Sequence, residues 1–211
     1  MAREPLVAIA DGDADTAQVA AFERDRRALL RRGLGLGGAV VAASSIPVLL
    51  AVRDAFAAND DDTTLLTKAI KLEHVSVLAY DTILGRGLLS ARVEALTRTL
   101  RGHEQQHADT LTTALTDLGG TPPPAPAGVA DVDAVVKGLG DIRTEADVLA
   151  FAIALETAAV AAYYDVQAKF IQSKLVQRGA AIMAAEGQHL VVLRQAARLA
   201  PVPAALETGG Q

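Results

Sequence analysis

The stretch Glu104-Gln105-Gln106-His107 decides the fold, because its spacing returns at Glu186-Gly187-Gln188-His189. The chain has four histidines, and two of them stand three residues after a glutamate. Residues i and i+3 share one face of an α-helix. Each Glu-x-x-His pair can therefore present a carboxylate oxygen and an imidazole nitrogen to the same point.

A lone glutamate precedes each pair at nearly the same distance. Glu73 lies 31 residues before Glu104, and Glu156 lies 30 residues before Glu186. Each lone glutamate stands in a stripe of apolar residues with the spacing of a buried helix face, where a carboxylate costs several kcal/mol unless it is paired or metal-bound. One Glu-x-x-His pair alone is typical of a surface helix. Two pairs with upstream partners indicate a metal site instead.

Turn signals predict a first helical hairpin. Its first helix begins near Asp62, and Asp60-Asp61-Asp62 is expected to be a solvated N-terminal cap rather than a metal patch. The helix ends at Gly85-Arg86-Gly87, and Ser90 is the predicted N-cap of the next helix. The midpoint between the first lone glutamate and its pair falls in this turn. The hairpin therefore brings them to one height.

A second hairpin follows after a break. Residues 119–143 form a predicted proline-rich crossover, with a short helix near Asp131–Leu139. A third helix begins at Thr144-Glu145-Ala146-Asp147, which is close to a capping box. Ser173 is the predicted cap of a fourth helix, and Pro201 stops that helix.

Four inward carboxylates and two histidines on four helices are the ligand pattern of carboxylate-bridged di-iron and di-manganese bundles. The chain resembles the ferritin-like superfamily over about residues 62–200. The resemblance implies an all-α fold, a ferritin-like four-helix bundle of two helical hairpins joined by a long crossover. It also implies two iron ions, with manganese as the alternative, since oxygen-rich sites with one imidazole per metal suit either. The implied metal ligands are Glu73, Glu104, His107, Glu156, Glu186 and His189, of which Glu104 and Glu186 bridge.

Three further residues are candidates for contact with the ligands. Tyr80 and Tyr163 each lie seven residues after a lone glutamate. They either relay electrons or are core residues whose hydroxyl bonds a ligand or a crossing helix. His103 lies four residues before a predicted histidine ligand, which places it beside the inward direction of its helix.

Composition excludes several other classes. The chain is mildly acidic, with a net charge of −5 and 3% aromatic residues, so a nucleic-acid partner is not expected. It has no cysteine, which excludes disulfides and an iron–sulfur cluster. No heme is expected, because Met183 is the only methionine after the predicted signal segment and no exposed symmetric methionine is evident.

The N-terminal segment 1–57 is expected to be a cleaved signal peptide. Asp25-Arg26-Arg27-Ala28-Leu29-Leu30-Arg31 looks like a twin-arginine export signal, and Ala55-Phe56-Ala57 fits a small-x-small cleavage site. The apolar stretch 33–52 is also long enough for a membrane anchor, which is the alternative if the signal is not cleaved. The expected domains of the mature protein are then the bundle at 58–200 and a short tail at 201–211. The expected location is the periplasm, the cell envelope or the outside of the cell.

The resemblance implies an exported di-iron protein that oxidises iron(II) with dioxygen or peroxide, as a ferroxidase-type oxidoreductase or in protection from oxidative stress. A first alternative is a dimanganese catalase-like or peroxidase-like enzyme. A second is a ferritin-like scaffold or binding protein of the envelope without enzymatic activity. The tail is too short for the extra helix that lines ferritin cage pores, so a monomer or dimer is expected rather than a storage shell.

Overall fold

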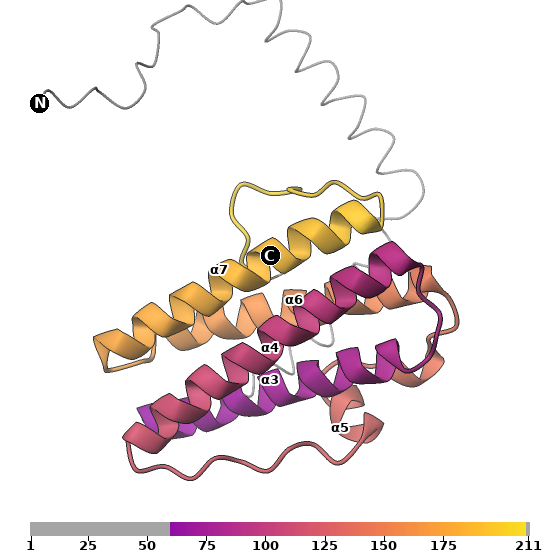
Figure 1. Ribbon diagram of the computed structural model, residues 1–211. Helices are drawn as coiled ribbons and strands as arrows, with labels where there is room; N and C mark the ends of the chain where they lie inside the picture. Colours follow the sequence, from indigo (N-terminus) through magenta and orange to yellow (C-terminus); the bar gives the residue numbers. More distant parts are fainter. Residues whose placement is uncertain (1–59, 210–211) are drawn as a thin grey trace, which may run out of the picture. The chain divides into compact units, whose positions relative to one another are not determined.

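The computed structural model describes residues 60–209, and this part of the chain contains helices and no strands. The predictions made for residues 1–57 lie outside the described residues. Four long helices form the fold (Figure 1), and their bounds are α3 Asp62–Leu84, α4 Ala91–Asp117, α6 Glu145–Gln167 and α7 Ser173–Ala196. The expected all-α fold is therefore confirmed.

The long helices pair as two hairpins. Helices α3 and α4 pack extensively against each other, as do α6 and α7, while α3 meets α6 and α4 meets α7 over smaller areas. The crossover after α4 runs from one end of the bundle to the other (Figure 1). As a result, α3 and α6 are antiparallel, and so are α4 and α7. The relative direction of the helices determines which residues of neighbouring helices lie at the same height in the bundle.

The start of α3 corrects part of the prediction for the aspartate run. Asp61 is the N-cap, and its Oδ1 accepts a hydrogen bond of 2.7 Å from the backbone N–H of Thr64. Asp62, however, is buried rather than solvated. Its carboxylate accepts bonds from the backbone N–H groups of Ile171 (2.9 Å) and Gln172 (3.2 Å). One aspartate caps its own helix, and the next ties the α6–α7 turn to α3.

One predicted serine cap is confirmed in position, and the other is displaced by one residue. Ser90 is the N-cap of α4, but its side chain makes no capping bond, and its backbone N–H donates to Glu145 at 2.5 Å. At α7 the N-cap is Gln172, one residue before the predicted Ser173. Asp62 serves that turn in place of a local side chain, which no pattern within the turn itself could predict.

The crossover holds less helix than predicted. It contains α5, Val129–Asp133, and a 3₁₀ turn at Leu139–Asp141, so the expected helix is split and shorter. Asp133 Oδ1 accepts from the backbone N–H groups of Gly138 and Leu139, both at 3.2 Å, which stabilises the turn between the two pieces. The predicted capping box at the start of α6 is confirmed by Thr144 and Asp147.

Helix α6 is the core helix of the bundle. Among the described helices, it alone is long and apolar enough to cross a membrane by length and composition. Most of its apolar stretch is buried inside the protein, which is typical of the central helix of a bundle. Its buried residues include Glu156 and Tyr163. Both of these residues belong to the site.

The segment after α7 returns along the bundle (Figure 1). Arg194 on α7 forms an ion pair of 2.7 Å with Glu207. Gly209 has a φ of +74° and lies so close to α6 that an added Cβ would be 2.3 Å from the backbone nitrogen of Ala161. A glycine therefore permits both the left-handed backbone and the close approach of the tail.

Candidate metal centre

Six polar side chains meet inside the bundle, and they are the six predicted metal ligands. Helix α3 supplies Glu73, α6 supplies Glu156, and α4 and α7 each supply one Glu-x-x-His pair. All four glutamates and His189 are buried, while the side chain of His107 keeps 12% of its surface exposed. The hairpin geometry expected from the sequence thus brings the whole set together.

The six side chains form two overlapping groups, each able to hold a metal ion. Within each group, one ligand atom per residue lies within 4.8 Å of every other. Glu104 and Glu186 belong to both groups, which is the sharing that the resemblance implied. The first group is Glu73, Glu104, His107 and Glu186, and the second is Glu104, Glu156, Glu186 and His189.

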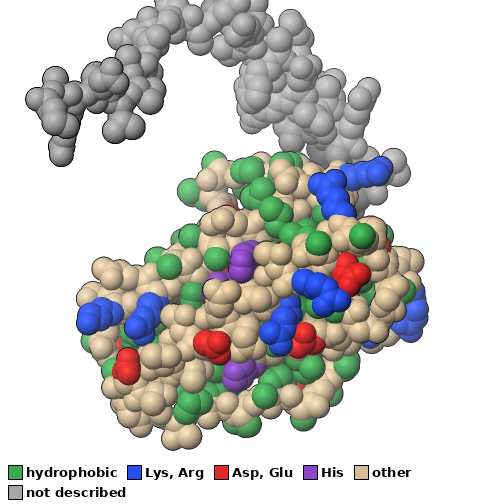
Figure 2. All heavy atoms as spheres, in the orientation of Figure 1, with side chains coloured by type: hydrophobic (Ala, Val, Ile, Leu, Met, Phe, Trp, Pro, Cys, Tyr) green, Lys and Arg blue, Asp and Glu red, His purple; other side chains and the backbone are tan. Residues whose placement is uncertain are grey.

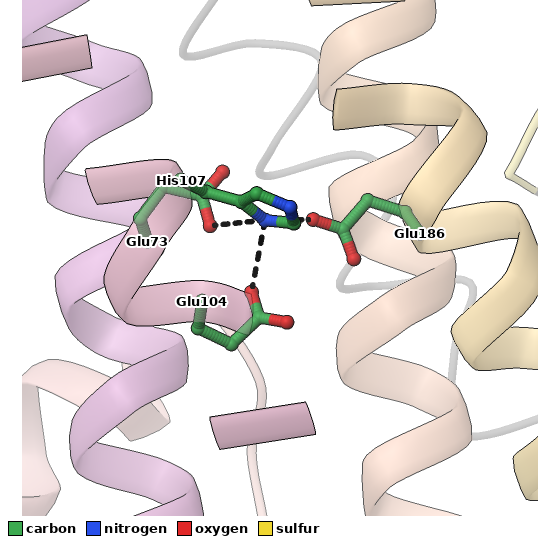
Figure 3. A group of neighbouring side chains, drawn as sticks. All are labelled: Glu73, Glu104, His107 and Glu186. Carbon is green, nitrogen blue, oxygen red and sulfur yellow. Dashed lines mark ion pairs between the residues drawn. The ribbon is translucent and has the colours of Figure 1, made fainter. Parts of the chain in front are cut away.

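In the first group, His107 Nδ1 faces three carboxylates (Figure 3). It lies 3.0 Å from Glu186 Oε1, 3.6 Å from Glu73 Oε2 and 3.9 Å from Glu104 Oε2. The ring comes from α4, and Glu73 and Glu186 reach it from α3 and α7. Side chains of three helices thus converge on one nitrogen.

The second group has the same arrangement around His189. Its Nδ1 lies 2.9 Å from Glu186 Oε2, 3.2 Å from Glu104 Oε1 and 3.3 Å from Glu156 Oε2. Each of the two shared carboxylates therefore directs one oxygen to each histidine. This division of oxygens suits a carboxylate that bridges two ions.

The two tyrosines bond the lone glutamates across the hairpins. The Tyr80 hydroxyl donates to Glu156 Oε1, and the Tyr163 hydroxyl donates to Glu73 Oε1. The spacing from glutamate to tyrosine is the same on α3 and α6, so antiparallel packing sets each tyrosine level with the glutamate of the other helix. The geometry matches the alternative in which the hydroxyl bonds a ligand. Electron relay stays a prediction.

Buried oxygens and one nitrogen of the cluster lack hydrogen-bond partners. Buried polar groups in proteins are normally hydrogen-bonded, and a buried carboxylate without a donor is costly. A metal ion would satisfy these atoms. The six residues therefore fit the dinuclear metal centre that the ferritin-like resemblance implies. The atoms are Glu73 Oε2, both oxygens of Glu104, both oxygens of Glu186 and His107 Nδ1.

In the metal-free state, the surroundings of the cluster favour the protonated forms of Glu104, Glu186 and His189. Burial, together with the charge of Glu156, raises the pKa values of Glu104 and Glu186 well above their usual range. Burial also acts against charged His189, but the carboxylates of Glu104, Glu156 and Glu186 close to its Nδ1 outweigh burial and raise the pKa of His189 to about 12. Metal binding would displace such protons, because ligands must be deprotonated to bind.

Two other pKa directions agree with the hydrogen bonds. Burial opposes the charge on Glu156, yet the hydrogen bond from His189 and the proximity of Glu186 prevail and lower the pKa of this carboxyl. Burial and the nearby carboxylates raise the pKa values of Tyr80 and Tyr163 well above the usual range. Both phenols are therefore neutral hydroxyl donors at physiological pH.

His103, the third candidate for contact with the ligands, lies on the outer side of His189. Its Nδ1 is 2.9 Å from His189 Nε2, and the two ring planes differ by 21° with centroids 5.2 Å apart. Burial and the neighbouring His189 lower the pKa of His103. Histidine side chains reach the surface on the face where α4 and α7 lie toward the viewer (Figure 2).

A helical bundle that brings four carboxylates and two imidazoles together in this order is typical of the ferritin-like class of proteins. A model of the family described as "Ferritin-like domain" matches residues 61–199, and the chain belongs to this family. The crystal structure of a conserved hypothetical protein, rv2844, from Mycobacterium tuberculosis has a similar fold, with a TM-score of 0.57 and 19% sequence identity. The similarity covers 69% of this chain and 96% of that chain. A comparison with curated proteins gives no match.

Proposed function

We propose that the protein binds two iron ions in this centre and oxidises iron(II) with dioxygen or peroxide. The observation that carries the proposal is the division of the Glu104 and Glu186 oxygens between the two histidines, with all four oxygens lacking a hydrogen bond. Two divalent ions in one site, about 3.5–4 Å apart, repel each other. Two shared carboxylates supply the negative charge that offsets this repulsion.

The lone glutamates complete the two metal positions. Glu73 and Glu156 each accept a tyrosine hydrogen bond on Oε1, which leaves Oε2 facing a histidine. The tyrosines thus fix the rotation of these carboxylates and hold one oxygen toward the centre. One position is served by Glu73 and His107, and the other by Glu156 and His189.

Iron supplies the electron chemistry once it is bound. Bound iron(II) would supply one electron per ion, so that two ions, with two protons, would reduce one dioxygen to hydrogen peroxide and become iron(III). The protein contributes a buried, oxygen-rich site that keeps the ions together and stabilises the more highly charged product ion, since hard oxygen ligands suit iron. The same donors suit manganese, and a catalase-like activity with manganese is the alternative outcome of the test.

The activity test uses the metal-free chain. We expect that two equivalents of iron(II), added without oxygen and then exposed to air, are oxidised faster than iron(II) in buffer, measured by a ferrous-iron chelator and an oxygen electrode. Glu104→Gln, which keeps the shape and removes the charge of a shared carboxylate, should abolish the acceleration. Arg98→Gln, which changes an exposed ion pair with Glu94 on the outside of α4, is the matched control. A manganese-loaded protein that decomposes peroxide while the iron form is inert would overturn the iron assignment.

We propose also that the protein is exported by the twin-arginine pathway and cleaved after Ala57. The support is the order of a twin arginine at Arg26-Arg27, an apolar stretch and a small-x-small tripeptide in the sequence. A mass spectrum of the exported form should correspond to a chain that begins at Ala58. A form that keeps residues 26–57 in the membrane fraction would instead support the anchor.

A further inference from the structure

The two halves of the centre differ at the residue that precedes each Glu-x-x-His pair. His103 precedes Glu104 on α4, whereas Ala185 occupies the same place before Glu186 on α7. The six ligands otherwise repeat in type, in spacing and in their reciprocal contacts. The residue at this place is therefore a chemical difference beside an otherwise two-fold arrangement.

The difference changes the environment of only one of the two ligand histidines. His189 directs Nδ1 to three carboxylates, and its Nε2 lies 2.9 Å from His103 Nδ1. His107 directs Nδ1 to carboxylates in the same way, but no group within residues 60–209 forms a hydrogen bond with its Nε2. His107 is also the more exposed ring. His189 therefore has neighbours at both of its ring nitrogens, whereas His107 has carboxylates at Nδ1 only.

A hydrogen bond at the outer nitrogen fixes which ring nitrogen carries the proton. A histidine that uses Nδ1 as a ligand must carry its proton on Nε2. The Nε2–H of His189 can donate to His103 Nδ1, which holds the ring orientation before any metal arrives and keeps the proton on Nε2 once a metal displaces the proton on Nδ1. Outer partners of this kind commonly change metal affinity by about 10- to 100-fold.

We propose that His103 is a positioning residue that makes the two metal positions unequal, so that the position served by Glu156 and His189 binds its ion first and more tightly. The inference rests on the proposed dinuclear centre. It goes beyond that proposal because the symmetric ligand set alone predicts two similar positions. The exposed position, served by Glu73 and His107, then fills second.

Cobalt(II) titration of the metal-free chain by calorimetry tests the order of binding. We expect two unequal binding steps in the wild type. In His103→Ala the tighter step should weaken by about 10- to 100-fold and the weaker step should stay unchanged. His103→Gln places an amide oxygen near the same nitrogen and should restore part of the loss. Ala185→His, on the other half, should strengthen the weaker step.

A second readout needs no metal. In the metal-free chain, the Nε2–H proton of His189 should give a slowly exchanging NMR signal in the wild type and in His103→Gln. It should exchange fast in His103→Ala, while the thermal unfolding midpoint stays close to that of the wild type. A merely space-filling role for His103 would leave this signal in place.

The outcomes separate the inference from the proposal on which it rests. Two ions bound with equal affinity would overturn the role of His103 while leaving the dinuclear centre intact. Equal weakening of both steps in His103→Ala would do the same. Uptake of one ion or none by the wild type would instead contradict the dinuclear centre itself.

Discussion

The Tyr163 hydroxyl on α6 donates a hydrogen bond to Glu73 on α3, a carboxylate 90 residues earlier in the chain. Tyr80 on α3 returns the same bond to Glu156 on α6. The buried hydroxyls of Tyr80 and Tyr163 thus connect the two hairpins by hydrogen bonds at the level of the cluster. Each phenol also fixes one oxygen of a carboxylate whose other oxygen faces a histidine.

Removal of one phenol should destabilise the bundle. Tyr163→Phe keeps the ring and leaves Glu73 Oε1 without its donor, so the free energy of unfolding of the metal-free protein should fall by about 2 kcal/mol. Tyr164→Phe is the matched control, because this neighbouring ring is 48% exposed and should change stability by less than about 0.5 kcal/mol. Urea unfolding measures both. Equal effects of the two variants would contradict the role given to Tyr163.

The aspartates at the start of α3 should differ in their effect on stability. Asp62→Ala leaves the backbone N–H groups of Ile171 and Gln172 without their acceptor and should cost about 2 kcal/mol. Asp61→Ala removes an exposed N-cap and should cost about 1 kcal/mol. Chemical unfolding of the two variants gives the ranking. A greater loss in Asp61→Ala would show that the tie between α3 and the α6–α7 turn contributes little.

Glu104→Gln should change how the stability of the metal-free protein depends on pH. The pKa of Glu104 is raised in the folded state, so its contribution is fully present below the unfolded pKa and is lost as pH rises through the folded pKa. Glutamine does not titrate. The variant should therefore gain stability relative to the wild type as pH rises above about 4.3, the ordinary glutamate pKa. Thermal unfolding in a metal chelator between acid and alkaline pH measures this difference, and a gain that shrinks with pH would contradict it.

Gly209 should be needed for docking of the tail. Gly209→Ala places a methyl group 2.3 Å from the Ala161 backbone and strains a left-handed residue, so residues 201–209 should detach from α6. Limited proteolysis should then cleave the tail faster, while the bundle itself unfolds at nearly the same temperature. Gly128→Ala is the control, because no atom lies within 4 Å of an added Cβ there. Equal cleavage of both variants would mean that the tail is not held at Gly209.

The sequence predicts most of the fold because the decisive signals are local and periodic. The two Glu-x-x-His pairs, with their upstream glutamates, predict four helices. The glycine turn at Gly85-Arg86-Gly87 then brings the predicted ligands of the first hairpin to one level. The capping box at Thr144 is equally local, and it too is confirmed.

Features that depend on contacts distant in sequence were not predictable in the same way. The burial of Asp62 and its bonds to the α6–α7 turn depend on how the hairpins dock. The partner of each tyrosine follows from the antiparallel packing of α3 and α6, although the equal glutamate-to-tyrosine spacing is a signal that could have suggested it. His103 was identified only by its position on the helix, since the sequence does not show that His189 Nε2 lies opposite.

The most direct test of the two-metal centre is an anomalous difference map, recorded at the iron absorption edge, from crystals loaded with iron(II) without oxygen. The map should show two peaks about 3.5–4 Å apart, with Glu104 and Glu186 between them. One peak should lie beside His107 Nδ1 and the other beside His189 Nδ1. A single peak, or no peak among these six side chains, would contradict the dinuclear centre.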